Sequence, residues 1–392
     1  MSPRILLLGL VLLTLVACEE DDQQLCGGVV FDEELFVQNV LDEMNDPSKT
    51  VAGYQFTVNR GGNLYVDTAF GVSVASGDGS GEAAMTPATR MNVASISKFI
   101  GTIALMQVLD DRGISIDADI QNYLPPTWAS DMHVEHVSDM GPCELTFRRL
   151  LRMESCLDFP LPGGTDPTPN PGRMCTTGEM FQAIDAPADV SLNATYQNGN
   201  FTLIRVLIGE LVYDIDETDP STSYNLATVD RYFEYITANI FDPAGIDPPS
   251  SRSEVDDHYA TTNFTNAYGY PYVNGETGWP ASNDPTRNPG SGGLVLSALD
   301  LAAILAYFQH SEVLVSSGVR EVILDNDLGL WATNKYPYKG GTRGPNDDDK
   351  AFRTAIMMFP NGTEAVLLVN SDRSDLRSVL ETAYDDAWVD PC

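Results

Sequence analysis

The chain has 392 residues, of which 43% are hydrophobic and 20% are charged. These are the values of a globular protein, so a disordered chain or a coiled coil is excluded. Acidic residues dominate, with 56 Asp and Glu against 22 Lys and Arg and a formal net charge of -34. Because such a surface repels phosphate backbones, we expect no nucleic-acid partner. The length allows two or three domains, or one large domain with insertions.

The N-terminus has the pattern of an export signal. Residues 1–17 carry one charge, Arg4, ahead of an apolar run that is too short for a membrane span but typical of a signal peptide. The run ends in Leu-Val-Ala-Cys18, which resembles the cleavage box of bacterial lipoproteins, where the cysteine is lipidated. Glu19 favours retention at the outer membrane, and residues 18–26 have the composition of an acidic tether. We expect an exported lipoprotein that faces the periplasm and contacts the membrane only through its lipid. The alternative is an ordinary secretory signal with a coincidental cysteine.

Periodic segments follow the tether. Apolar residues at helical spacing predict helices within 31–45 and 93–109. Alternating residues in 53–60 and 63–74, joined by a Gly-Gly turn, predict a β-hairpin.

The second half of the chain differs from the first in composition. Residues 114–285 mix short helical runs with loops rich in proline and glycine. Helices are predicted at 296–309 and 374–388, and strands at 351–360 and 364–371 around an Asn-Gly turn.

Together these elements predict a mixed α+β fold. An antiparallel sheet would take strands from both ends of the chain, with helices packed on it and a large, mostly helical insertion between them. One domain would span 27–392, with an α/β part at 27–94 and 286–392 and a helical part at 95–285.

The cysteines leave the disulfide pattern open. Export makes disulfides possible, and an odd number of cysteines follows Cys18: Cys26, Cys143, Cys156, Cys175 and Cys392. The first and last of these are placed to tie the chain ends together, and any two of the other three are candidates for a bridge. Because no Cys-x-x-Cys or Cys/His cluster is present, we expect no zinc site.

Ser95-Ile-Ser-Lys98 stands at the start of the predicted helix at 93–109. Residues three apart lie on one helical face, so Lys98 can hold its amine close to the Ser95 hydroxyl. A neighbouring base is what turns a serine into a nucleophile. The alternative is a helix cap followed by a solvated lysine.

Two further motifs support the catalytic interpretation. Tyr196-Gln-Asn198 lies in a polar loop just before a helix, and Lys339-Gly340-Gly341-Thr342 comes just before the terminal strands. Glycine at 341 leaves room for a backbone edge to approach a substrate closely. A second Tyr-x-Asn, at 272–274, ranks lower because no helix follows it.

Ser-x-x-Lys, Tyr-x-Asn and Lys-x-Gly, in that order, resemble the three motifs of the serine β-lactamase and penicillin-binding-protein superfamily. The resemblance extends over roughly 30–390. Residues 86–125 resemble the segment around the nucleophile in class C β-lactamases, related esterases and D-aminopeptidases, and residues 145–157 and 291–305 resemble later family segments. Lys-Gly-Gly departs from the usual Lys-Thr-Gly, whose hydroxyl helps to hold the carboxylate of a β-lactam. This favours an esterase or peptidase.

The resemblance implies the proton chemistry of the site. Ser95 would attack an acyl carbonyl. Tyr196, with its pKa lowered by Lys98 and Lys339, would act as the general base, and Lys98 would shuttle or stabilise the proton.

The same resemblance implies how a substrate is held. Asn198 would orient Lys98 and the substrate amide, and Lys339 and Gly341 would line the binding site. Backbone N–H groups of Ser95 and Thr342 would form the oxyanion hole. No metal or cofactor is implied.

The expected function is therefore an exported serine hydrolase that acts on an ester, a D-amino-acid peptide or a β-lactam through an acyl-serine intermediate. One alternative is a surface-anchored binding protein that has kept the fold and lost turnover. Another is an adhesion lipoprotein with calcium held by the acidic loops at 214–219 and 346–349.

Overall fold

The computed structural model describes residues 28–79, 81–131, 144–157, 176–185, 191, 195–216, 223–260, 265–280, 285–286, 289–331, 335–344 and 348–390. The signal sequence, the tether and Cys18 lie outside these residues. Cys156 forms a disulfide, and the other cysteines are not among the residues that the structure describes.

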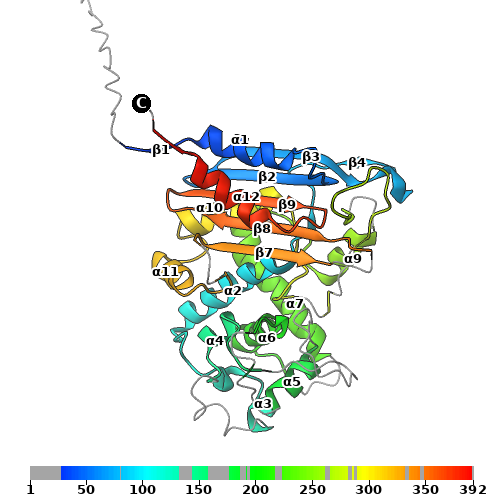
Figure 1. Cartoon of the computed structure of the whole chain (residues 1–392). Coiled ribbons are helices and arrows are strands. Elements are labelled where there is room, and N and C mark those ends of the chain that lie inside the picture. The colour runs from blue at the N-terminus through cyan, green and yellow to red at the C-terminus, as the bar shows by residue number, and fades with distance from the viewer. Residues whose placement is uncertain are drawn as a thin grey trace, which may run out of the picture.

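A six-stranded antiparallel sheet forms the upper half of the molecule in Figure 1. Its strands run in the order β4-β3-β2-β9-β8-β7. The two ends of the chain meet where β2 pairs with β9, with Tyr54 opposite Val369. The predicted mixed α+β fold with a sheet built from both chain ends is confirmed. The strands are β2 (Gly53–Arg60), β3 (Asn63–Val74), β4 (Ala83–Ala84), β7 (Tyr338–Arg343), β8 (Phe352–Met358) and β9 (Thr363–Val369).

Helices α1 (Glu33–Met44) and α12 (Leu376–Asp386) cover one face of the sheet. Their apolar side chains form a core with alternate residues of the strands, including Phe56 of β2 and Met357 of β8. Asp32 caps α1 through its side chain, which accepts a hydrogen bond from the backbone N–H of Leu35. Burial of these alternate positions explains why α1 and α12 hold to the sheet.

Helix α10 (Ala298–His310) packs on the opposite face. Buried polar residues of β2 bond to the first turns of this helix. The Gln55 side chain accepts from the Ala298 N–H, and the Asn59 amide donates to the Ala302 carbonyl. These contacts give buried polar groups the partners that they require.

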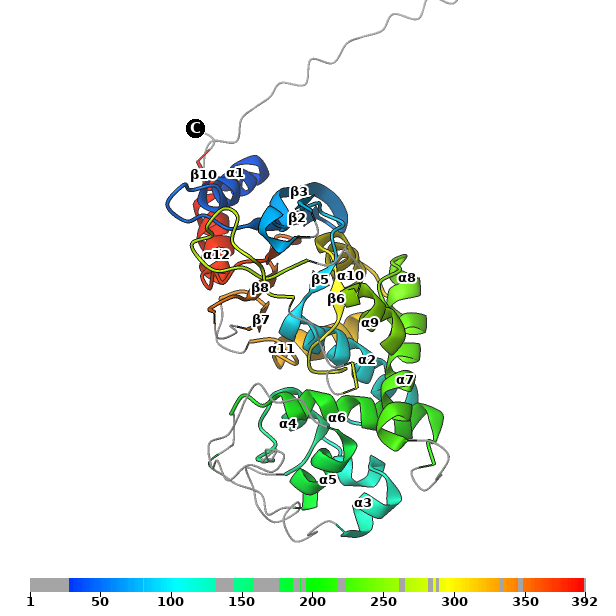
Figure 2. The same cartoon turned by 90° about the vertical axis from the view of Figure 1, so that its right-hand side faces the viewer.

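The helical half lies below the sheet in Figures 1 and 2. Its centre is α2 (Ser97–Arg112), in which 12 of 16 residues are buried because neighbouring elements surround it. The helix begins at Ser97, later than predicted, because a short 3-10 helix, η2 (Ala94–Ile96), precedes it. The other helices of this half are α3 (Pro126–Asp131), α4 (Phe147–Leu151), α5 (Thr177–Asp185), α6 (Asn198–Ile208), α7 (Tyr224–Ile236), α8 (Asp242–Ala244) and α9 (Arg252–Ala260).

Short elements complete the described part of the chain. Helix α11 precedes β7, and two two-stranded sheets join distant segments. Their bounds are α11 (Ser317–Asp325), β1 (Val30–Phe31) with β10 (Trp388–Val389), and β5 (Met91–Asn92) with β6 (Val295–Leu296).

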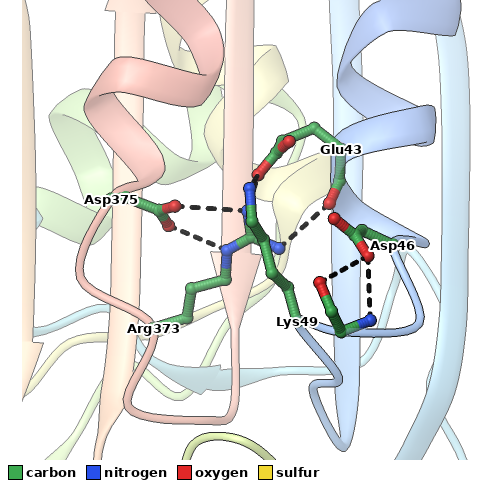
Figure 3. Close-up of polar contacts among 6 residues, drawn as sticks. Glu43, Asp46, Lys49, Arg373 and Asp375 are labelled. Atoms are coloured by element: carbon green, nitrogen blue, oxygen red, sulfur yellow. Dashed lines mark hydrogen bonds and ion pairs between the residues drawn. The ribbon is translucent and has the colours of Figure 1, made fainter.

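A buried arginine ties α1 to the start of α12, as Figure 3 shows. The side chain of Arg373 is fully buried and forms ion pairs with Glu43 at the end of α1 and with Asp375 just before α12. Lys49 bonds to the same Glu43 carboxylate at 2.5 Å, while Asp46 accepts bonds from Ser48 beside it. This cluster fixes the loop that enters α12.

Candidate active site

Ser95 lies in η2, between the edge of the sheet and α2. The preceding residue, Ala94, has a φ of 48°, and its N–H donates to the Asn92 side chain at 2.8 Å. A non-glycine residue in this region of backbone space is strained, and such residues cluster at functional sites. The strained turn presents Ser95 to strand β7. A Cβ on Gly341 would lie 2.7 Å from the Ser95 nitrogen, so the packing of β7 against η2 requires glycine at this position.

Lys98 is fully buried beneath Ser95. Its Nζ lies 3.1 Å from Ser95 Oγ, and it donates to Asn198 Oδ1 at 2.5 Å and to the Ser291 carbonyl. Burial lowers the pKa of Lys98 well below its ordinary value, and the nearby charge of Lys339 lowers it further. The surroundings of Lys98 therefore disfavour the charged form of its amine.

Tyr196 completes the contacts of the serine. Its hydroxyl lies 2.6 Å from Ser95 Oγ, and its ring stacks on Trp331 with the ring centroids 5.3 Å apart and an angle of 17° between the planes. Burial of the hydroxyl raises the pKa of Tyr196 to about 12, although the hydrogen bond to Ser95 opposes this. The expected lowering of the Tyr196 pKa by the two lysines is wrong, because removal of the phenol from water raises this pKa and burial also disfavours the charged form of each lysine.

Lys339 is 1% exposed on β7. Its Nζ lies 4.9 Å from the centroid of the Trp331 ring and 6.0 Å from that of Phe201. Burial lowers the pKa of Lys339 to about 7. The indole of Trp331 therefore contacts both Tyr196 and Lys339, a role that no sequence motif indicated.

A cavity of about 580 Å³ opens around the edge of β7. Its lining includes Ser95, Tyr196 and Asn198, together with residues of β7, of β8 and of the start of α12. The exposed Thr342 accepts a hydrogen bond on its Oγ1 from Arg353 at 2.6 Å. The remaining lining residues are Trp331, Tyr338, Gly340, Gly341, Thr354, Arg373, Ser374, Leu376, Arg377 and Ser378.

The structure thus brings together the residues that the three motifs nominated. Ser95, Lys98, Tyr196 and Asn198 form one hydrogen-bonded group, and Lys339 to Thr342 lie in the edge strand β7, which pairs with the first of the two predicted terminal strands. The second Tyr-x-Asn lies elsewhere, where Tyr272 packs on Tyr268 at 5.5 Å between centroids. Its lower rank is consistent with this placement.

Other sequence features find no further site within the described residues. No group of three or more His, Cys, Asp or Glu side chains there is arranged to hold a metal ion. In the same residues, no helix has both the length and the apolar character of a membrane span. Half of each acidic loop proposed for calcium, at 217–219 and at 346–347, lies outside the described ranges.

Comparison with known proteins places the chain in a family. The family model described as Beta-lactamase matches residues 37–362, so the chain belongs to the Beta-lactamase family. No curated protein sequence matches the chain.

Solved structures share the fold at low sequence identity. EstCE1, described as a hydrolase with promiscuous acyltransferase activity, is 14% identical, with a TM-score of 0.62 over 90% of this chain and 98% of that one. FmtA from Staphylococcus aureus is 14% identical, with a TM-score of 0.61 over 92% and 91% of the two chains. The D-amino acid amidase from Ochrobactrum anthropi SV3 is 15% identical, with a TM-score of 0.59 over 90% and 98%.

Proposed function

We propose that the chain is a serine hydrolase that forms an acyl-serine intermediate on an ester or a D-amino-acid peptide. The observation that carries this proposal is the placement of Ser95 Oγ in the cavity, 3.1 Å from the Lys98 amine and 2.6 Å from the Tyr196 hydroxyl. A serine in contact with a buried amine and a phenol has both a base and an acid within reach.

Lys98 is the base in the first step, in place of Tyr196, to which the resemblance gave this role, because burial raises the pKa of the Tyr196 phenol to about 12 and keeps it protonated. As a neutral amine it directs its two N–H groups to the Asn198 and Ser291 carbonyl oxygens, which leaves the lone pair for the Ser95 proton. Ser95 Oγ then forms a bond to the acyl carbon while its proton moves to Lys98. Asn198 holds the amine in place for this transfer.

The leaving group departs in the second step. The N–H groups of Ser95 and Thr342 stabilise the oxyanion of the tetrahedral intermediate. As the bond from the acyl carbon to the leaving atom breaks, Tyr196 gives that atom its phenolic proton and regains the one that Lys98 took from Ser95. Water then attacks the acyl-serine by the reverse route and restores the free hydroxyl.

The substrate preference rests on strand β7. Lys339-Gly340-Gly341 offers no side-chain hydroxyl of its own at position 340, so β-lactams rank below esters and D-amino-acid peptides. The shared fold supports this range, since EstCE1 is described as a hydrolase with acyltransferase activity and another relative is a D-amino acid amidase.

The test is a parallel screen of the purified protein and its Ser95→Ala variant. The substrates are p-nitrophenyl butyrate, a peptide ending in D-alanyl-D-alanine, and a chromogenic β-lactam. We expect Ser95-dependent hydrolysis of the ester or the peptide at a higher kcat/KM than the β-lactam. Saturable binding without turnover of any of the three would instead favour the binding-protein function.

We also propose that the protein is exported and anchored by a lipid on Cys18. This rests on the short apolar run of residues 1–17 and on the Leu-Val-Ala-Cys sequence that ends it.

A further inference from the structure

The space beside Gly340 is occupied by a neighbouring side chain of the same strand. A Cβ built on Gly340 would lie 2.0 Å from Tyr338 Oη and 2.7 Å from its Cζ. Residues two apart on a strand share a face, and the phenol of Tyr338 folds along β7 across the glycine. Any side chain at position 340 must therefore displace it.

This placement puts a hydroxyl where a threonine would have put one. The hydroxyl oxygen of a threonine at position 340 would be bonded directly to that Cβ, and Tyr338 Oη lies only 2.0 Å from the same point. Both Tyr338 and Gly340 line the cavity that holds Ser95. Tyr338 therefore supplies a hydroxyl close to the place where a threonine at position 340 would have supplied one.

The phenol is able to act as a hydrogen-bond donor. Burial raises the pKa of Tyr338 to about 12, so the hydroxyl keeps its proton over the range in which enzymes work. The ring is half-buried between the cavity and the core beneath α12, and this packing restricts the positions open to the ring.

We propose that Tyr338 is a substrate-binding residue, whose hydroxyl donates a hydrogen bond to an uncharged oxygen acceptor of the substrate in place of a hydroxyl at position 340. The inference rests on the proposed function and names the group that the site recognises beyond the scissile bond. An amide or ester carbonyl meets the requirement.

The preference for an uncharged group follows from the charges around the phenol. Arg353 is paired with Asp372 at 2.6 Å, and Arg377 lies 3.6 Å from Glu381. The third arginine of the lining, Arg373, is held by the two carboxylates seen in Figure 3. Because each of these arginines has a carboxylate partner, and the chain carries a net charge of -34, we expect a substrate carboxylate to gain little attraction here.

The test compares Tyr338→Phe with the wild type on two depsipeptide esters, which differ only in ending with a carboxamide or a carboxylate. We expect the wild type to prefer the carboxamide. Loss of the hydroxyl lowers kcat/KM for the carboxamide about tenfold, mainly through KM, as expected for one hydrogen bond to an uncharged group.

Tyr336→Phe is the matched control. Tyr336 lies two residues earlier, and its hydroxyl bonds to Asp385 at 2.6 Å outside the cavity lining. We expect this variant to lose some thermal stability and to keep the wild-type kcat and KM on both esters. If both tyrosine hydroxyls had only a structural role, the kinetic constants and the thermal stability of the two variants would change alike.

A second pair of variants tests whether the Tyr338 phenol occupies the space beside position 340. Gly340→Thr alone is expected to push the phenol aside and to lower kcat/KM. When Gly340→Thr is added to Tyr338→Ala, the threonine fills the vacated space and is expected to restore most of the kcat/KM that Tyr338→Ala lost. The same substitution thus has opposite effects in the two backgrounds. Equal effects in both would contradict the proposed geometry.

The outcomes separate this inference from the proposed function. Labelling of Ser95 by a fluorophosphonate, together with unchanged kinetics in Tyr338→Phe or a wild-type preference for the carboxylate, overturns the role of Tyr338 alone. Absence of labelling on folded wild type, with no ester hydrolysis, overturns the proposed function and this inference with it.

Discussion

Replacing Lys339 by methionine is expected to stabilise the protein while it impairs catalysis. Lys339 is 1% exposed, and burial lowers its pKa to about 7 from the ordinary 10.5. At 1.36 kcal/mol per pH unit, this difference corresponds to about 5 kcal/mol of unfavourable burial of the charged amine. Methionine fills similar space without that cost, although it forfeits the cation–π contact with Trp331, worth about 1–2 kcal/mol.

The pH dependence of the unfolding free energy follows from the lowered pKa of Lys339. Between pH 7 and 10.5 the unfolded chain keeps the proton of Lys339 while the folded protein has lost it, so the stability of the wild type rises with pH through this window. The variant lacks this gain. Its advantage in unfolding free energy is therefore largest at and below pH 7 and falls by about 1.4 kcal/mol per pH unit above it.

Urea unfolding of both proteins at pH 6, 7, 8, 9 and 10 measures the difference. Lys335→Met serves as the control, because Lys335 is mostly exposed and paired with Asp385. Its difference from the wild type is expected to be flat over the same range. A flat difference for Lys339→Met as well would refute the conclusion that Lys339 loses its charge near neutrality.

Three further predictions follow. Trp331→Ala should lower kcat about tenfold, because the stacked ring that positions Tyr196 is lost. Trp331→Phe should keep most of the activity. Equal losses of kcat in the two variants in steady-state assays would contradict a stacking role. Arg373→Met should destabilise the protein by about 1–3 kcal/mol in denaturant unfolding, because the partly exposed carboxylates of Glu43 and Asp375 lose their buried partner while Glu43 keeps Lys49. No measurable change would show that Lys49 and solvent replace the arginine. Cys18→Ser should abolish incorporation of labelled palmitate in a bacterial host, and persistent label would disprove lipidation at that residue.

The sequence predicted best the elements whose signals are local. The hairpin was predicted at 53–60 and 63–74, and β2 and β3 have these bounds because a Gly-Gly turn and alternating residues act within a few positions. Strand β7 was missed. Its Tyr-Lys-Gly-Gly-Thr-Arg sequence has weak strand preference, and it becomes a strand by pairing with β8, from Tyr338 opposite Met357 to Arg343 opposite Phe352.

In the candidate site, too, local sequence patterns predicted some features, and others depend on the folded structure. The spacing of Ser95 and Lys98 and the order of the motifs were enough to nominate residues that do lie together. The raised pKa of Tyr196 and the position of Trp331 depend on how deeply distant segments bury one another, which no local pattern encodes. Position 340 shows this most clearly, since only the folded strand reveals that Tyr338 occupies it.

The most direct test of the account is the intact mass of the purified protein after incubation with a fluorophosphonate, with Ser95→Ala and Lys98→Met in parallel. The account predicts one adduct on the wild type, none on Ser95→Ala, and labelling at least about 100-fold slower on Lys98→Met, because the buried amine is the base that activates the serine. An adduct that persists on Ser95→Ala, or folded wild type that takes no label, would contradict it.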